Sequence, residues 1–152
     1  MMRHFRTIAA ILLASASLAT ATVKGWTTDF EAAKAQAKKE GKSLLLVFTG
    51  SDWCPPCKAL HKDVFSKKSF IDSAKKNFIL VELDYPRKGD QSKELKAQNK
   101  ELAKKYKIRA YPTVLLLDAN GKVFKKVEGN PDFTVKSMNE MLKTSLSAKK
   151  FN

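Results

Sequence analysis

Two cysteines separated by two residues are the groups in this sequence with the clearest chemistry. Cys54 and Cys57 are its only cysteines, and they follow the apolar run 43–48 at the start of a helix-like stretch. If Cys54 precedes the first helical turn, its sulfur faces free N–H groups and the positive end of the helix dipole. That environment lowers the pKa of a thiol to roughly 3.5–7.5, against about 8.5 for a free cysteine. The pattern predicts thiol–disulfide exchange, in which Cys54 attacks and Cys57 resolves the mixed disulfide.

The residues around the cysteines are expected to tune this thiol. Proline is tolerated in a first helical turn because the N–H groups there lack partners within the helix. Pro55 and Pro56 supply no N–H group. The amides that remain to point at the Cys54 sulfur are therefore those of Cys57 and Lys58.

Two other uses of the cysteines are weaker interpretations. A structural disulfide across two residues closes a very small loop and constrains little of the unfolded chain. A zinc site needs about four ligands, and the sequence adds only His61 and His4 to the cysteines. We therefore expect no metal, and no bound cofactor, because the two thiols themselves carry the two electrons.

The first 21 residues have the composition of an export signal. A positively charged start is followed by an apolar and small-residue stretch over 8–19, and Ala19-Thr20-Ala21 fits the small-x-small cleavage pattern. An uncleaved anchor is the alternative, although the stretch is short for a membrane span. The sequence thus predicts a signal peptide over 1–21, a single domain over 22–152, and a periplasmic or otherwise extracytoplasmic location.

Positive charge is spread along the whole chain. The formal net charge is +14, and Arg3 and Arg6 account for two of these charges, so removal of the signal leaves +12. Beyond the signal the only arginines are Arg87 and Arg109. Nucleic-acid sites usually combine arginine with exposed aromatic residues. The lysines instead lie along every expected helix, so we interpret them as solvated faces and expect no nucleic-acid partner; anionic partners or envelope surfaces are the alternative.

Periodicity and turn residues define the expected elements. Buried strands are indicated by unbroken apolar runs, and Asn120-Gly121 is typical of a hairpin that leads into an antiparallel strand, with a bulge or edge placement. The expected strands are 43–49, 78–84, 113–117 and 123–128. The expected helices are 28–40, opened by a Thr28–Glu31 capping box and ended by Gly41, then 54–65, 69–76, 92–106, and 133–146 with Pro131 or Asp132 at its start.

With its motifs, this order of elements resembles the thioredoxin superfamily over about residues 26–147. The segment Trp53-Cys54-Pro55-Pro56-Cys57-Lys58 is similar to the family's active site. Residues 105–113 are similar to the segment that carries its cis-proline, here Tyr111-Pro112, and Gly129 matches a glycine after the last hairpin. The resemblance implies an α/β thioredoxin fold, with a central mixed four- to five-stranded sheet flanked by helices on both faces.

The resemblance also implies a substrate surface and a set of partners. Trp53 and Tyr111-Pro112 would shape that surface, with the Tyr111 backbone free to pair with an extended segment. The exported members of the family imply disulfide-bearing protein substrates and a membrane-embedded electron donor. We expect a monomer.

The sequence departs from the family at two positions. Many thioredoxins have a buried aspartate six residues before the first cysteine, which relays protons for the resolving cysteine, but that position is Phe48 here. Asp52, Glu82 or water would have to replace it, or the relay is missing. The first residue between the cysteines is proline, where thioredoxin has glycine.

Several functions stay open at this point. No histidine lies between the cysteines, a feature of strongly oxidising relatives, which favours a reductase over an oxidase or isomerase that would use the same residues. His61 lies one turn after Cys57, and we expect a partly buried, neutral histidine there. A copper-binding chaperone using Cys54, Cys57 and His61 is a rival, although such relatives use a later histidine that this chain lacks. An interaction protein with a vestigial cysteine pair is a third class.

Overall fold

The central element of the molecule is a five-stranded mixed sheet. The computed structural model describes residues 23–129 and 132–150, so the expected signal peptide lies outside the described residues. The strand order is β1-β3-β2-β4-β5. β1 and β2 run parallel to β3, whereas β4 is antiparallel to both β2 and β5. The strands are β1 (Trp26–Thr27), β2 (Ser43–Thr49), β3 (Phe78–Asp84), β4 (Thr113–Leu117) and β5 (Val123–Glu128).

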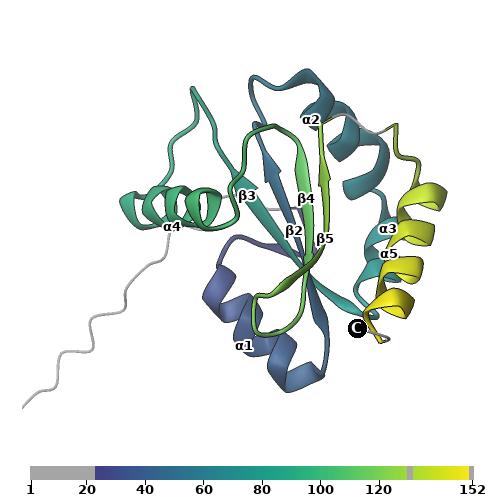
Figure 1. The fold of residues 1–152 in the computed structure, drawn as a ribbon. Coiled ribbons are helices and arrows are strands. Elements are labelled where there is room, and N and C mark those ends of the chain that lie inside the picture. Colours follow the sequence, from purple (N-terminus) through teal and green to yellow (C-terminus); the bar gives the residue numbers. More distant parts are fainter. Residues whose placement is uncertain (1–22, 130–131, 151–152) are drawn as a thin grey trace, which may run out of the picture.

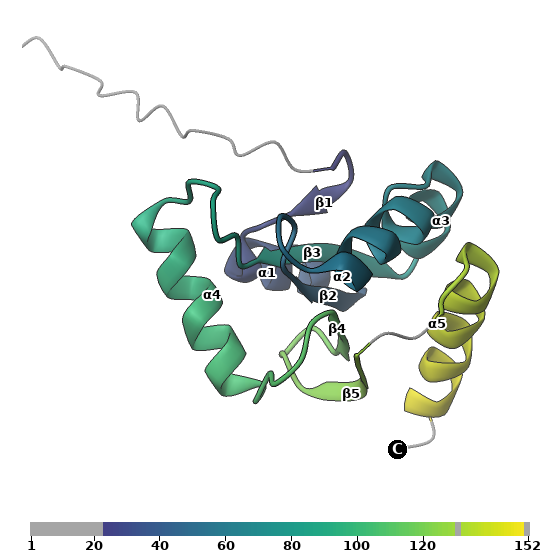
Figure 2. The same ribbon diagram turned by 90° about the horizontal axis from the view of Figure 1, so that it is seen from above.

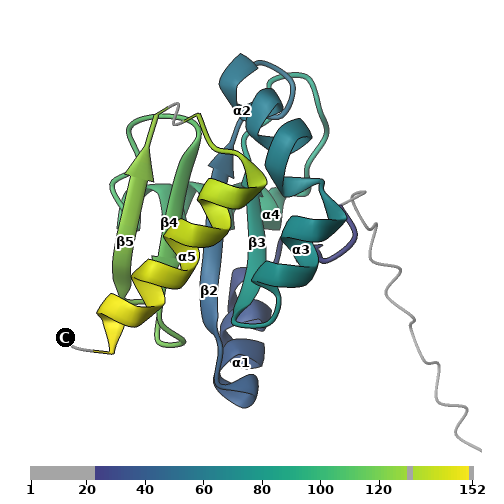
Figure 3. The same ribbon diagram turned by 90° about the vertical axis from the view of Figure 1, so that its right-hand side faces the viewer.

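Helices cover both faces of this sheet, as Figures 1 and 2 show. One layer holds α1 (Phe30–Glu40) and α4 (Lys93–Lys105). The other layer holds α2 (Pro55–Leu60), the π-helical turn η1 (His61–Phe65), α3 (Lys68–Ala74) and α5 (Val135–Lys149). Figure 3 shows α3 and α5 side by side in front of the sheet. The predicted α/β fold, with helices on both faces of a mixed sheet, is confirmed.

Strand β2 forms the middle of the hydrophobic core. All seven of its residues are buried, and successive side chains point to opposite faces of the sheet. Leu44, Leu46 and Phe48 pack in the cluster beneath α1 and α4, whereas Leu45 and Val47 pack in the cluster beneath α2, α3 and α5. A strand that is apolar on both sides needs a layer of helices on each, which explains the three-layer arrangement.

Most predicted elements are found, and the strand bounds at 43–49, 78–84, 113–117 and 123–128 are confirmed. The two-residue strand β1 was missed, because its pairing with Leu80 and Val81 depends on tertiary placement. The expected helix over 54–65 is divided into α2 and the π-helical turn. β5 lies at the sheet edge, and its register with β4 shifts between Leu116 and Leu117, as the irregular pattern indicated.

Two expected helix starts were wrong in detail. Asp29, rather than Thr28, is the N-cap of α1, and its carboxylate accepts the Ala32 N–H at 2.9 Å. The last helix begins at Val135 with a reciprocal capping box between Thr134 and Ser137, rather than at 133; Pro131 lies outside the described residues.

The hairpin predicted at Asn120-Gly121 is found between the antiparallel strands β4 and β5. Only its glycine has positive φ, at 88° for Gly121. The Asp118 carboxylate organises the turn by accepting the N–H groups of Asn120 and Lys122, each at 2.9 Å.

Among residues 23–129 and 132–150, no helix is both long enough and apolar enough to cross a bilayer.

Phe48 is a central residue of the core beneath α1 and α4. Its side chain is fully buried, stacks on the ring of Tyr85 at 6.4 Å and meets the edge of Tyr106 at 6.5 Å. Phe48→Ala should therefore lower the free energy of unfolding by about 3–5 kcal/mol, the range for a truncated core phenylalanine. Urea unfolding followed by circular dichroism measures this loss. Phe48→Leu is the matched control and should lose distinctly less; equal losses would contradict the packing described.

Candidate active site

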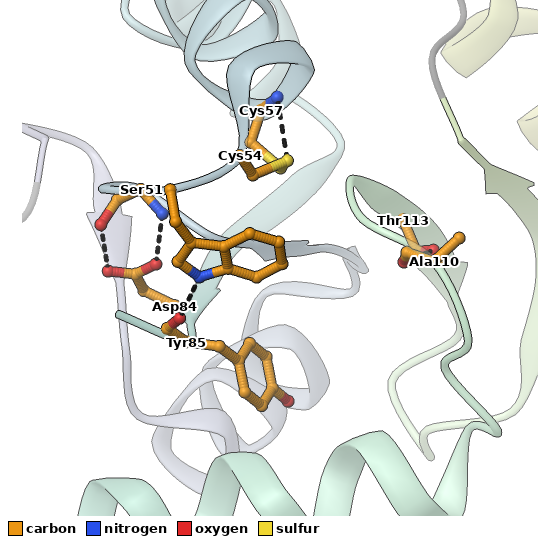
Figure 4. Close-up of a disulfide and its surroundings, with 8 residues drawn as sticks. Ser51, Cys54, Cys57, Asp84, Tyr85, Ala110 and Thr113 are labelled. Carbon is orange, nitrogen blue, oxygen red and sulfur yellow. Dashed lines mark hydrogen bonds between the residues drawn. A yellow bond between two sulfur atoms is a disulfide. The ribbon is translucent and has the colours of Figure 1, made fainter. Parts of the chain in front are cut away.

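The two cysteines form a disulfide at the N-terminus of α2 (Figure 4). Cys54 is the N-cap residue, with extended backbone angles, and Pro55 and Pro56 occupy the first two helical positions. The Cys57 N–H group donates to the Cys54 sulfur at 3.3 Å. The prediction that Cys54 caps the helix, with its sulfur facing an amide of the first turn, is thus confirmed.

The expected second amide is not directed at the sulfur. The Lys58 N–H group donates to the Cys54 carbonyl oxygen at 3.1 Å, because Lys58 is already within the regular hydrogen-bonding pattern of the helix. Its side chain is exposed. Both cysteines are nearly buried in the disulfide, with exposed fractions of 4% for Cys54 and 2% for Cys57.

The loop between β2 and α2 is anchored to the neighbouring strand. Thr49 and Asp84 are paired at the ends of the parallel strands β2 and β3. The Asp84 carboxylate then accepts the Ser51 N–H at 2.9 Å and the Ser51 hydroxyl at 2.6 Å, as drawn in Figure 4. The Cys54 N–H group donates to the Gly50 carbonyl at 3.0 Å. These bonds fix where the first cysteine leaves the sheet.

Trp53 connects three loops around the disulfide. Its indole N–H donates to the Tyr85 carbonyl at 2.7 Å, and its ring meets the edge of the Tyr111 ring at 5.6 Å. The Arg87 guanidinium lies over the indole at 4.2 Å. The indole ring can lie against the backbone of residue 50 because that residue is glycine: a Cβ on Gly50 would lie 2.4 Å from the ring.

Asp52 binds the loop that follows β3. Its carboxylate accepts the Arg87 N–H at 3.0 Å and the Lys88 N–H at 2.7 Å. Hydrogen bonds from these two backbone amides hold the pKa of Asp52 below its usual value. The Asp52 carboxylate thus binds the loop after β3 and does not face the resolving cysteine. Asp52 therefore does not replace the proton-relaying acid that is missing at position 48.

Glu82 is the carboxyl group that shares a cavity with the resolving cysteine. Cys57, His61, Glu82 and Pro112 line a small space of about 10 Å³, on the order of the room that one water molecule needs. Within the described part of the chain, the Glu82 carboxylate has neither a hydrogen bond nor an ion pair. Burial raises its pKa, and the nearby charge of Asp84 raises it further. His61 is partly buried, as expected.

The register of the sheet explains why Glu82, and not residue 48, faces this cavity. Glu82 is paired with Val47, and both line the cavity beneath Cys57. Phe48 is the next residue along β2, so its side chain points to the opposite face, where it contacts Tyr85 and Tyr106.

The expected cis-proline segment lies beside the disulfide. The Tyr111–Pro112 peptide bond is cis, as the resemblance implied. The Thr113 hydroxyl donates to the Ala110 carbonyl at 2.7 Å and closes the turn, and the Pro112 carbonyl accepts the Gly129 N–H at 3.1 Å. Figure 4 shows Ala110 and Thr113 on a loop across from the cysteines. The structure thus brings Trp53, Tyr111 and Pro112 together around Cys54 and Cys57.

Sequence reasoning overlooked the residues that hold this arrangement. Ser51, Asp84 and the carbonyl of Tyr85 were not singled out, and Arg87 was noted only as a charge. An acidic residue at the end of β3, beside the end of β2, was the available signal for the Ser51 contact. In the described ranges no group of three or more His, Cys, Asp or Glu side chains could hold a metal ion.

Comparisons with known proteins agree with this geometry. A family model described as a thioredoxin-like domain matches residues 30–144. A disulfide bond reductase, DsbH, of Chlamydia pneumoniae is 33% identical over 95 residues, which cover 62% of this chain and 57% of the relative. The thiol:disulfide interchange protein DsbD of Vibrio cholerae is 30% identical over 94 residues, which cover 62% of this chain and 14% of that protein.

A solved structure of a DsbH oxidoreductase superimposes with a TM-score of 0.73 and 25% identity. The match covers 88% of this chain and 95% of that structure. Against the two curated relatives, in contrast, the chain spans just over half of one and about a seventh of the other.

Proposed function

The chain belongs to the thioredoxin-like domain family, and from this premise we propose that it is an exported thiol–disulfide oxidoreductase that reduces disulfides in envelope or secreted proteins. One observation carries the proposal: the Cys57 N–H group donates to the sulfur of Cys54 at the N-terminus of α2. In the reduced protein the same amide and the helix dipole would stabilise a thiolate on Cys54.

The proposed reaction transfers two electrons through the cysteine pair. The Cys54 thiolate attacks one sulfur of a substrate disulfide, forms a mixed disulfide and releases the other substrate sulfur as a thiolate, which takes up a proton. The Cys57 thiol then loses its proton and attacks Cys54, which forms the disulfide seen here and releases the second substrate thiol. The substrate gains two electrons, and the protein loses two.

The surface around the pair supports binding of an extended segment. Trp53 and Tyr111 pack edge to face, and each also contacts Tyr85. Pro112 is buried and lines the same cavity as Cys57. These contacts support the assignment of Trp53, Tyr111 and Pro112 to substrate binding. Pro55 and Pro56, at the first two helical positions, and the exposed charge of Lys58 are proposed to tune the thiol.

Glu82 is proposed to accept the proton of Cys57 during the second step. It is a carboxylate in the cavity that Cys57 lines, and its raised pKa makes it a stronger base than an exposed glutamate. His61 lines the same cavity, and the charge of Asp84 acts on Glu82 from the end of β3.

The proposed location and electron donor rest on the N-terminal segment and on the relatives. Residues 1–21 are proposed to be a signal peptide that is removed on export, which leaves one domain over 22–152 outside the cytoplasm. In that compartment a reductase needs a supply of electrons, and the match to part of a thiol:disulfide interchange protein supports a membrane-embedded donor. The name of the disulfide bond reductase relative supports the reducing direction.

Replacing Cys57 with serine should trap substrates on Cys54. Release of the mixed disulfide needs a second thiolate within bonding reach, and Cys57 is the only other cysteine in the chain. Incubated with oxidised envelope extract, Cys57→Ser should collect high-mass adducts on non-reducing gels that dithiothreitol dissolves. Cys54→Ser is the matched control and should collect none; equally empty lanes for both variants would contradict the mechanism.

Replacing Glu82 with glutamine should slow the resolving step without slowing attack. Stopped-flow absorbance with a chromogenic aromatic disulfide separates the first thiol release, which reports attack, from the second, which reports resolution. Because the pKa of Glu82 is raised, its carboxylate is protonated below that pKa and can accept a proton only above it. The resolution rate of the unmodified protein should therefore rise with pH through that pKa, and Glu82→Gln should lower it by roughly tenfold to a hundredfold above the pKa.

Asp63→Asn, which neutralises an exposed carboxyl in the same helical region, is the control for this experiment and should keep the full pH profile. An unchanged profile in Glu82→Gln would show that Cys57 loses its proton to another group.

The midpoint potential tests the direction of the reaction. Equilibration with a series of glutathione buffers, read by alkylation and mass spectrometry, should give a value near about −270 mV, in the range of reducing thioredoxins. A value near about −120 mV, typical of a strong oxidant, would instead assign the protein to disulfide formation with the same residues.

A further inference from the structure

The two arginines of the described residues both lie in loops that also carry residues of the candidate site. Arg87 follows β3, and Arg109 lies two residues before Tyr111 in the segment that leads to Pro112. All other basic side chains of residues 23–129 and 132–150, apart from His61, are lysines. We call this pair, Arg87 and Arg109, the arginine rim.

Arg87 is held in place beside the cysteine motif. Its guanidinium stacks over the Trp53 ring at 4.2 Å, and its backbone N–H group is fixed by the carboxylate of Asp52. Trp53 and Asp52 are the two residues immediately before Cys54. The charge of Arg87 is therefore positioned by the same residues that present the attacking sulfur, and little side-chain freedom remains to be lost when a ligand binds.

Neither arginine of the rim forms an ion pair with the described residues. The ion pairs of the described residues lie elsewhere, at Lys34–Glu31, Lys42–Glu40, Lys68–Asp72 and Lys126–Glu128. Two acids of the loops around the disulfide are already used, since Asp52 binds backbone amides and Asp84 binds Ser51. Arg87 and Arg109 are exposed, as are Lys58 and Lys88.

We propose that the arginine rim binds an acidic segment that flanks the disulfide of the protein substrate, and thereby selects acidic partners. The proposal rests on the proposed thiol–disulfide exchange at Cys54. Arginine suits this use because its planar guanidinium pairs with a carboxylate through two parallel hydrogen bonds, even while its face stacks on an aromatic ring. A carboxylate bound there would lie beside Trp53 and so hold the substrate close to the neighbouring sulfur. A protein segment is favoured over a lipid headgroup because Arg87 stacks on Trp53, and the Trp53 ring also packs against Tyr111 in the segment that carries Pro112.

Reduction of three matched peptides tests the proposal. Each peptide carries one internal disulfide, flanked by aspartates, by serines or by lysines, and the reduced protein is reacted with each under single-turnover conditions with acid quenching and mass spectrometry. The readout is the rate constant for the acidic peptide divided by that for the serine peptide, because this ratio cancels any general effect on the cysteines. The unmodified protein should give a ratio of about five to ten at low salt, which falls towards one in 1 M salt.

Charge reversal at the rim should invert this preference. Arg87→Glu should bring the ratio below one and favour the lysine peptide, Arg109→Glu should lower the ratio, and Arg87→Lys should keep a ratio above one. Lys39→Glu is the control with the same change in net charge: Lys39 is exposed in the last turn of α1, at the end of the sheet opposite α2 in Figure 1, and its substitution should leave the ratio unchanged.

Three outcomes would overturn the inference, and they are distinguishable. Failure to reduce even the serine peptide would refute the proposed function, and the rim proposal with it. Reduction of all three peptides with a ratio that Arg87→Glu and Lys39→Glu leave equal would refute the rim alone. Equal peptide rates, together with binding to phosphatidylglycerol-containing vesicles that Arg87→Glu abolishes, would assign the rim to a lipid surface instead.

Discussion

Burial of β2 on both of its faces is the constraint on which the rest of the molecule depends. Every residue from Ser43 to Thr49 is buried, so the strand has to lie in the middle of the sheet with a layer of helices on each side. After β2 the chain leaves the core at Thr49, and its path there is fixed by the pairing of Thr49 with Asp84 and by the Asp84–Ser51 hydrogen bonds. Because the path of the chain is fixed at Thr49 and Ser51, Cys54 is placed at the N-terminus of α2. The environment of the Cys54 sulfur is therefore a consequence of how the end of β2 is packed.

The residues just before the cysteines serve two purposes at once. Asp52 and Trp53 both bind the loop after β3, the first through backbone amides and the second through the Tyr85 carbonyl and the stacked Arg87. The same Trp53 ring packs against Tyr111 in the cis-proline segment. Three loops that are distant in the sequence thus share one aromatic side chain. Such sharing keeps the surface around the sulfur atoms in one arrangement before a substrate arrives, which lowers the ordering cost of binding.

Features determined by neighbouring residues could be predicted from the sequence, whereas features determined by register could not. The apolar runs define β2, β3 and β4, and the CxxC spacing with its prolines defines the N-cap at Cys54, because these signals are local. The choice of Asp29 over Thr28 as a helix cap depends on small differences between two adjacent residues that can both cap. The contacts of Asp84 and Arg87 depend on which strands become neighbours. The sequence alone therefore shows that these residues are charged but not which groups they contact.

The position of the buried acid shows how strand alternation limits where a proton acceptor can be placed. A side chain on β2 reaches the cavity beneath Cys57 only if it has the parity of Val47, and Phe48 has the other parity. A carboxylate at position 48 would lie among Tyr85 and Tyr106, where burial among aromatic rings would strongly disfavour its charge. Glu82 avoids this conflict because it is the β3 partner of Val47, so its side chain lies on the same face of the sheet as Val47. Its position is only partly buried, so the charged form is less disfavoured there. The sheet can thus supply a carboxyl group to the resolving cysteine from a neighbouring strand while the central strand stays entirely apolar between Leu44 and Phe48.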